Sequence, residues 1–265
     1  MRHSTKKSPR SEDVSSPKDD GTMSLRGHLK ELRNRLILCV VVFIIFTVVF
    51  LGKAQDLVTL FTDMGEELGY VFVYIAPQEL LMQYFKVSLI AAVFAALPLI
   101  LYECWAFASP GLTRTENITM LFVMIFGFLC FIIGVYFAWR VILPFMLNFF
   151  FELGTGSTIT ANISVESYLN FLITVFVIFG LVFEMPLVSV ILSRIGILTP
   201  KFMRKWRSVA IVLIFILAAI ITPPDVFSQI MVVIPMLALY EISILLSEIV
   251  TRFFRKPKEE EPEEA

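Results

Sequence analysis

The fold of this chain is decided by residues 209–240, VAIVLIFILAAIITPPDVFSQIMVVIPMLALY, in which two apolar runs meet at a short polar break. The first run, Val209–Ile221, has 13 residues. As a helix it is about 20 Å long at 1.5 Å per residue, whereas the hydrocarbon core of a bilayer is about 30 Å thick. The stretch therefore predicts a tight helical hairpin that is short for a membrane, so that either the bilayer thins there or the turn lies at depth.

The break itself is predicted to be a helix boundary. Pro223 and Pro224 end the first helix, and Asp225 is placed to cap the N-terminus of the second. A carboxylate in the outer half of a membrane is costly and usually has a functional reason. We therefore expect Asp225 to be a cap, a role that does not exclude a further function.

The composition around this hairpin is that of a polytopic membrane protein. Hydrophobic residues make up 57% of the chain, charged residues 17%, and the mean hydropathy is +0.81. Soluble chains average about 45–50% apolar residues even when Gly is counted. The charges gather in residues 1–35, 194–207 and 248–264, with long uncharged runs between them.

Several function classes find no support in the sequence. The net charge of −1 gives no field for nucleic acid. Cys39, Cys104 and Cys130 lie in apolar runs, which favours reduced core residues over disulfides. No His and Cys cluster has metal-ligand spacing, no cofactor motif occurs, and no Ser/His or paired-Asp arrangement suggests an enzyme.

Six apolar segments are predicted to span the membrane as helices, because lipid offers an open backbone no other hydrogen-bond partner. Residues 1–23 are expected to be a disordered tail, residues 24–250 the six-helix domain, and residues 251–265 an acidic tail. The segments are Leu36–Leu51, Leu80–Phe107, Ile118–Trp139, Tyr168–Leu192, Val209–Ile221 and Val226–Val250.

The distribution of Lys and Arg predicts the orientation. Nine of the 22 precede residue 36, Arg114 follows the second segment, five lie in 194–207 and four in 252–258. By the positive-inside rule both termini are cytoplasmic. The outer loops are then 52–79, 140–167 and the proline turn, and the first two are expected to form caps. Thr199 followed by Pro200 predicts a short helix on the inner side. No internal repeat supports a transporter built from two halves.

Two carboxylates on the basic inner face are candidates for binding. Glu31 has two interpretations, an i,i+4 pair with Arg35 or a cation site. Glu116 completes the pattern Thr113-x-x-Glu116, which is typical of a capping box. Alternatively, each carboxylate could accept an arginine in a bidentate fork, which would discriminate Arg from Lys.

Four further acidic residues lie within apolar segments, and three of them, Glu103, Glu184 and Glu241, are given an interpretation; the fourth is Glu248. Glu184 sits ten residues before Arg194, beside the helix-kinking Pro186. It is interpreted either as a hydrogen-bond partner for that break or as lining a polar cavity. Glu241 is open between the same readings, and Glu103 is expected at the interface. The rival hypothesis is a proton-coupled transporter of small solutes that uses Glu184 and Asp225.

Four motifs, in order along the chain, resemble the TatC family of twin-arginine protein translocase subunits. HLKELRNRL (28–36) is similar to the N-terminal family signature HLxELRxRL, and YECWAFASPGL (102–112) is similar to the first cytoplasmic loop. VFEMP (182–186) and TPPDVFSQ (222–229) are similar to the fourth-helix motif and to the turn between the fifth and sixth helices.

This resemblance implies a cupped six-helix bundle in the bacterial cytoplasmic (inner) membrane, acting as receptor for signal peptides with paired arginines. It further implies homo-oligomers working with the single-span subunits TatA and TatB, to export folded proteins using the proton-motive force. By matching motifs, Glu31 and Glu116 correspond to the arginine-binding carboxylates, and Arg33 and Phe107 to neighbouring recognition positions. Glu184 corresponds to the polar residue inside the cup, and Asp225 to the residue at the hairpin.

Overall fold

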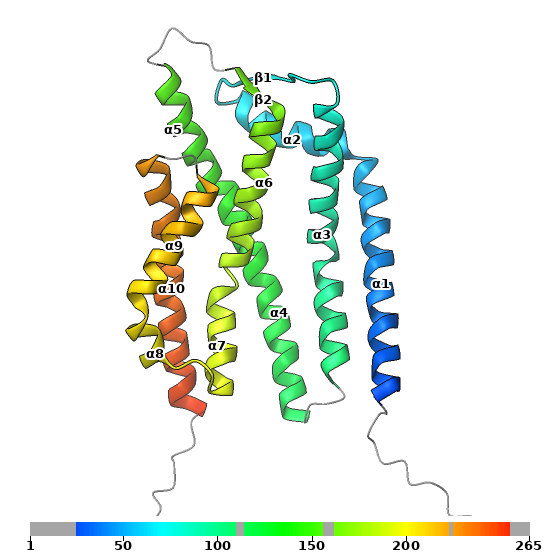
Figure 1. Cartoon of the computed structure of the whole chain (residues 1–265), viewed down its shortest axis with the longest axis vertical. Helices are drawn as coiled ribbons and strands as arrows, with labels where there is room; N and C mark the ends of the chain where they lie inside the picture. Colours follow the sequence, from blue (N-terminus) through cyan, green and yellow to red (C-terminus); the bar gives the residue numbers. More distant parts are fainter. Residues whose placement is uncertain (1–24, 110–113, 156–161, 223–224, 255–265) are drawn as a thin grey trace, which may run out of the picture.

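A computed structural model describes residues 25–109, 114–155, 162–222 and 225–254, which are almost entirely helical. The long helices run side by side, and the first residues of α1 lie at the same end as the last residues of α10 (Figure 1). The elements are α1 (Leu25–Leu51), α2 (Ala54–Glu66), β1 (Val71–Val73), α3 (Glu79–Ala108), α4 (Arg114–Phe137), the π-helical turn η2 (Ala138–Ile142), α5 (Leu143–Thr155), β2 (Asn162–Ser164), α6 (Val165–Val182), α7 (Met185–Ile195), α8 (Pro200–Lys205), α9 (Arg207–Ile221) and α10 (Val226–Phe254).

Five helical stretches among the described residues are long and apolar enough to cross a membrane. They correspond to five of the six predicted segments. The remaining segment forms α9, which has 15 residues and is therefore only about 22 Å long. The short helix at the hairpin is confirmed, whereas a sixth crossing stays a prediction. The spanning stretches are Gly27–Leu51, Glu79–Phe107, Leu121–Gly154, Val165–Arg194 and Val226–Arg252.

The third segment is longer than predicted. It was expected to end at Trp139, but the helix continues through η2 into α5 as far as Thr155. The π turn inserts a wider hydrogen-bonding register just before Pro144, so that the missing proline N–H falls in the first turn of α5. The expectation that residues 140–167 form a separate cap was therefore wrong for their first half.

The other end boundary also differs. α10 extends to Phe254, so residues 251–254 belong to the bundle and not to an acidic tail. The predicted tails at 1–23 and 255–265 lie outside the described residues.

The end of the molecule opposite the α1 start and the α10 end is closed by α2 and by two short parallel strands (Figure 1). Phe72 of β1 pairs with Ile163 of β2. The buried carboxylate of Glu79 connects these pieces. Its Oε2 accepts from the backbone N–H of Ile75 at 2.8 Å, and its Oε1 accepts from Ser164 Oγ at 2.5 Å and from the N–H of Glu166 at 2.9 Å. The strands and this junction were not predicted, because both pair residues distant in sequence.

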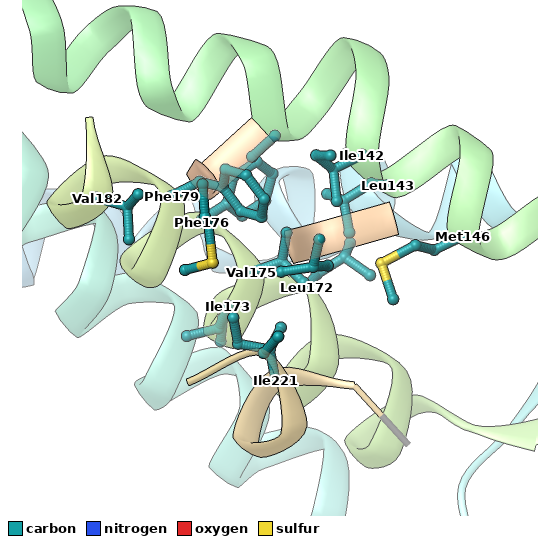
Figure 2. Packing of buried hydrophobic residues seen from close by; sticks show 14 of the residues in the cluster. Ile142, Leu143, Met146, Leu172, Ile173, Val175, Phe176, Phe179, Val182 and Ile221 are labelled. Atoms are coloured by element: carbon teal, nitrogen blue, oxygen red, sulfur yellow. The ribbon is translucent and has the colours of Figure 1, made fainter. Parts of the chain in front are cut away.

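The core lies where η2 and α5 cross α6. Side chains of Ile142, Leu143 and Met146 meet those of Leu172 and Phe176 (Figure 2). All five are buried. Because these residues come from the helical stretch that continues α4 and from α6, the core holds together the middle of the bundle. In contrast, no described side chain of α1 is buried, and α1 packs mainly on α3.

The close approach of α4 to α6 depends on a glycine. A Cβ atom added at Gly134 would come within 2.6 Å of the carbonyl oxygen of Phe179 and 2.8 Å of the Cβ of Phe183. Small residues allow helix backbones to pack tightly inside a membrane, where lipid supplies no hydrophobic force between helices. Gly134 therefore sets the distance between α4 and α6.

The proline turn between α9 and α10 is capped as predicted. Asp225 Oδ1 accepts a hydrogen bond from the N–H of Ser228 at 2.7 Å, the geometry of an N-cap. Gln229 Nε2 donates to the carbonyl of Phe215 at 3.1 Å and so ties the two helices together. The predicted cap at Thr199 is also confirmed, since its side chain accepts from the N–H of Phe202 at the start of α8. Pro223 and Pro224 lie outside the described residues.

Replacing Asp225 by alanine is expected to destabilise the protein by about 1 kcal/mol, because the first turn of α10 loses its cap. Asp225→Asn keeps an acceptor at the same position and is expected to restore most of the loss. The measurement is thermal unfolding of the purified protein in detergent. Asp63→Ala removes an exposed carboxylate from α2 and serves as the control; an equal loss in Asp63→Ala would contradict the capping role.

Candidate functional site

Three charged side chains meet at the end of the bundle where α1 begins and α3 ends. Arg35 of α1 donates to Oε1 of Glu31 from Nε at 3.1 Å and from Nη2 at 2.5 Å. Its remaining nitrogen, Nη1, donates to Oε2 of Glu103 on α3 at 2.8 Å. We call this group the Glu31–Arg35–Glu103 cluster. It joins α1 to α3 by one guanidinium that bridges two carboxylates.

The two carboxylates differ in how they are satisfied. The side chain of Glu103 is 10% exposed and that of Glu31 is 22% exposed. Oε1 of Glu31 accepts both donors from Arg35, while its Oε2 is buried and finds no hydrogen-bond partner among the described residues. A buried charged oxygen without a donor is costly, so this atom is the place in the cluster that favours an additional cation.

The sequence predicted only part of this cluster. The i,i+4 pair between Glu31 and Arg35 is confirmed. Glu103 was expected merely at the interface, and its contact with Arg35 across 68 positions was missed. The available signal was that Glu103 is an ionisable residue inside an apolar segment, because such residues usually pair with one another.

An aromatic pair lies beside the cluster. The rings of His28 and Phe107 stack with their centroids 4.1 Å apart and their planes inclined by 17°. His28 precedes Glu31 by three positions and therefore lies on the same face of α1, which brings Phe107 to that face. Arg33 is exposed and lies about 200° around the helix from Glu31. The structure thus brings Phe107, but not Arg33, to the side of Glu31.

The second predicted carboxylate is placed only by its backbone. Glu116 belongs to the first turn of α4, which lies at the same end of the bundle as the start of α1 and the end of α3 (Figure 1). Its side chain, and Thr113 of the predicted capping box, lie outside the described residues.

Glu184 sits at a break between α6 and α7, as the neighbouring Pro186 predicted. Its carboxylate lies over Gly127 of α4, where an added Cβ atom would come within 3.2 Å of Oε2. Glu184 also lines a cavity of about 470 Å³ between α7, α8, α9 and α10. The other residues lining this cavity include Met185, Leu192, Phe202, Trp206 and Leu213. The cavity is thus mainly apolar, and the expectation of a polar one was wrong.

The hydroxyl of Ser189, and not the carboxylate of Glu184, hydrogen-bonds the backbone at this break. Ser189 Oγ donates to the carbonyl of Pro186 at 2.8 Å and approaches that of Ser243 on α10 at 3.3 Å. The carboxylate of Glu184 makes no hydrogen bond or ion pair with any described residue. The alternative in which Glu184 bonds the local break was therefore wrong. No described contact joins Glu184 to Asp225, the second residue of the rival transporter hypothesis.

The two acidic residues of α10 form ion pairs with basic residues of α8, α9 and α10. Glu241 pairs with Arg207, and Glu248 pairs with both Arg204 and Arg252. Glu241 was left open between bonding a helix break and lining a polar cavity, and the structure instead shows a third arrangement, an ion pair with Arg207. No group of three His, Cys, Asp or Glu side chains that could hold a metal ion occurs in the described part of the chain.

A sequence model of the family described as Sec-independent protein translocase protein (TatC) matches residues 27–235. The chain belongs to the TatC family. The Sec-independent protein translocase protein TatC of Desulforapulum autotrophicum is 40% identical over 90% of this chain and 87% of its own length. That of Listeria innocua serovar 6a is 36% identical, over 87% of this chain and 94% of its own length. A crystal structure titled Twin Arginine Translocase Receptor-TatC superposes with a TM-score of 0.75, at 34% identity, covering 85% of this chain and all of the other.

Family membership and the apolar helices together define the general role of the molecule. It is a multi-pass membrane protein and a membrane subunit of the Sec-independent, or Tat, translocase. TatC proteins take part in protein transport and are not enzymes. The Glu31–Arg35–Glu103 cluster therefore lies in a helical bundle with the same fold as the TatC crystal structure.

Proposed function

We propose that this TatC-family chain is the receptor for signal peptides with paired arginines and the core membrane subunit of the export machinery. The observation that carries the proposal is Oε2 of Glu31, a buried carboxylate oxygen without a described donor. It lies at the end of the bundle that the positive-inside rule assigns to the cytoplasm, where a signal peptide first arrives.

The chemistry of the cluster suits a guanidinium. One arginine faces two carboxylates, so the cluster carries a net charge of −1 and is completed by one further cation. An arginine of the peptide can present two parallel N–H donors to a carboxylate, which a lysine cannot do. We propose that the first arginine binds Glu31 and the second binds Glu116, with Phe107 beside them.

Family membership supports a wider role. We propose that the protein acts in the bacterial cytoplasmic membrane, in receptor complexes with further copies of itself and with TatA and TatB, and that the proton-motive force drives folded cargo across. The short α9 supports a locally thinned bilayer. Glu184 and Asp225 are the proposed polar residues for coupling within the membrane.

The test is direct binding of leader peptides to the purified protein in nanodiscs. A peptide with the native Arg-Arg pair is expected to bind at least about tenfold more tightly than the same peptide with Lys-Lys. The two peptides carry the same charge, so the comparison isolates the geometry of the guanidinium. Equal affinity for both peptides would overturn the proposed receptor function.

Photocrosslinking locates the site independently. A photoreactive residue introduced at position 31 or 116 is expected to crosslink to an Arg-Arg precursor. One introduced at position 241 of α10, whose native glutamate pairs with Arg207 of α9, is not. Crosslinks of equal yield at all three positions would contradict a defined site at Glu31 and Glu116.

A further inference from the structure

The Glu31–Arg35–Glu103 cluster contains an arginine of the protein itself at the place proposed for an arginine of the peptide. Arg35 contacts Glu31 through two nitrogens, but both reach the same oxygen, Oε1. A guanidinium that is free to settle on one carboxylate normally uses both of its oxygens in a fork. Arg35 does not, and the atom left over is Oε2 of Glu31.

Glu103 accounts for this arrangement. Its carboxylate takes Nη1 of Arg35 at 2.8 Å from the neighbouring helix, and its side chain is the more buried of the two. A buried carboxylate that lost its cation would be strongly destabilised, so Arg35 is held toward α3. With Nη1 held by Glu103, Glu31 meets the Nε–Nη2 edge of the guanidinium, and both N–H donors of that edge reach Oε1.

The net charge of the cluster also favours binding of a second guanidinium. With Glu103 ionised, two negative charges face one positive charge, and a second guanidinium is attracted. With an amide at position 103, the cluster would be neutral, and Arg35 could turn to occupy both oxygens of Glu31. The incoming arginine would then have to displace Arg35 from its own salt bridge.

We propose that Glu103 is a positioning residue for signal-peptide binding, which acts by holding Arg35 away from Oε2 of Glu31 and so keeps that oxygen without an internal donor, available to pair with the first arginine of the peptide. This proposal rests on the proposed receptor function and adds to it a residue that makes no contact with the peptide. Arg35 is then an internal competitor for Glu31, restrained by Glu103.

A double-mutant cycle separates this indirect role from direct contact. Glu103→Gln is expected to weaken binding of the Arg-Arg peptide by about tenfold, because Arg35 then closes over Glu31. In an Arg35→Gln background, the competitor is absent, and Glu103→Gln is expected to change the affinity by less than about twofold. An undiminished effect of Glu103→Gln in that background would show direct contact and overturn the proposal.

Glu241→Gln is the matched control. It removes one negative charge at the same end of the bundle, from a carboxylate paired with Arg207, and is expected to leave peptide binding unchanged. A loss equal to that of Glu103→Gln would mean that net charge alone matters, which would also overturn the positioning role. Thermal unfolding of each variant reports whether it is folded.

Arg35→Lys gives a second, independent readout. A lysine keeps the charge but has no fork, so it cannot bridge Glu103 and Glu31 in the same geometry, and the preference for Arg-Arg over Lys-Lys peptides is expected to fall. An unchanged preference would contradict the proposal even if Glu103→Gln failed to fold.

The two proposals fail in different ways. If the wild-type protein does not distinguish Arg-Arg from Lys-Lys, the receptor function itself is wrong. If the wild-type protein does distinguish them and Glu31→Gln loses binding, but Glu103→Gln binds as the wild type does, only the positioning role of Glu103 is wrong.

Discussion

Glu31→Gln is expected to weaken binding of a paired-arginine leader by about 2 kcal/mol, or about thirtyfold in Kd. The substitution keeps the size of the side chain but removes the charge that faces the incoming guanidinium. It also replaces one carboxylate oxygen by an amide group, so that a two-oxygen fork can no longer form. Arg35 retains Glu103 as a partner, so the contact between α1 and α3 is expected to survive. The measurement is the Kd of the leader peptide for the purified protein in nanodiscs.

The control for this experiment is again Glu241→Gln, which changes the formal charge equally. A binding loss confined to Glu31→Gln, with both proteins melting at similar temperatures, locates the site on α1. Wild-type affinity in Glu31→Gln would exclude Glu31 from the binding site and leave the unpartnered Oε2 without a ligand to explain it.

Gly134→Ala is expected to destabilise the bundle by about 2 kcal/mol, although it adds only one methyl group. The new Cβ atom would lie 2.6 Å from the carbonyl oxygen of Phe179, a backbone atom of α6 that cannot move away as a side chain can. The helices α4 and α6 must then separate, which weakens the core formed around Phe179 and Leu143. The measurement is the melting temperature in detergent together with the yield of folded protein.

Gly154→Ala is the matched control within the same continuous helical stretch. A Cβ atom added at Gly154 meets nothing within 4 Å, and alanine is the better helix former. This variant is therefore expected to be as stable as the wild type or slightly more stable. If Gly134→Ala were equally well tolerated, the close approach of α4 and α6 would not be what limits the stability of the bundle.

Local features of the structure could be predicted because each depends on residues close in sequence. The caps at Thr199 and Asp225 need only a side-chain acceptor and an N–H three residues further on. The break before α7 needs only Pro186, and the pair of Glu31 and Arg35 needs only one helical turn. The helical extents were less predictable: the third segment was expected to end at Trp139, but a π turn carries the helix on past Pro144.

The site was predicted incompletely for a related reason. Arg35 could be assigned one partner from helical spacing, but its second partner comes from another helix. The cavity beside Glu184 is apolar because Phe202 of α8, Trp206 between α8 and α9, and Leu213 of α9 line it, and no pattern within α6 and α7 contains that information. The stacking of Phe107 on His28 likewise depends on how α1 packs against α3.

The sequence by itself determined that this is a helical membrane protein with a short terminal hairpin. It also placed Glu31 and Glu116 at the end of the bundle that is rich in Lys and Arg. Both conclusions depend on hydropathy, charge and capping, which act along the chain over a few residues. The tertiary structure alone decided that one guanidinium binds two carboxylates and that one buried oxygen of Glu31 has no hydrogen-bond donor among the described residues. That outcome depends on the position of α3 beside α1, which is fixed by packing between residues far apart in sequence and not by the local preferences of either helix.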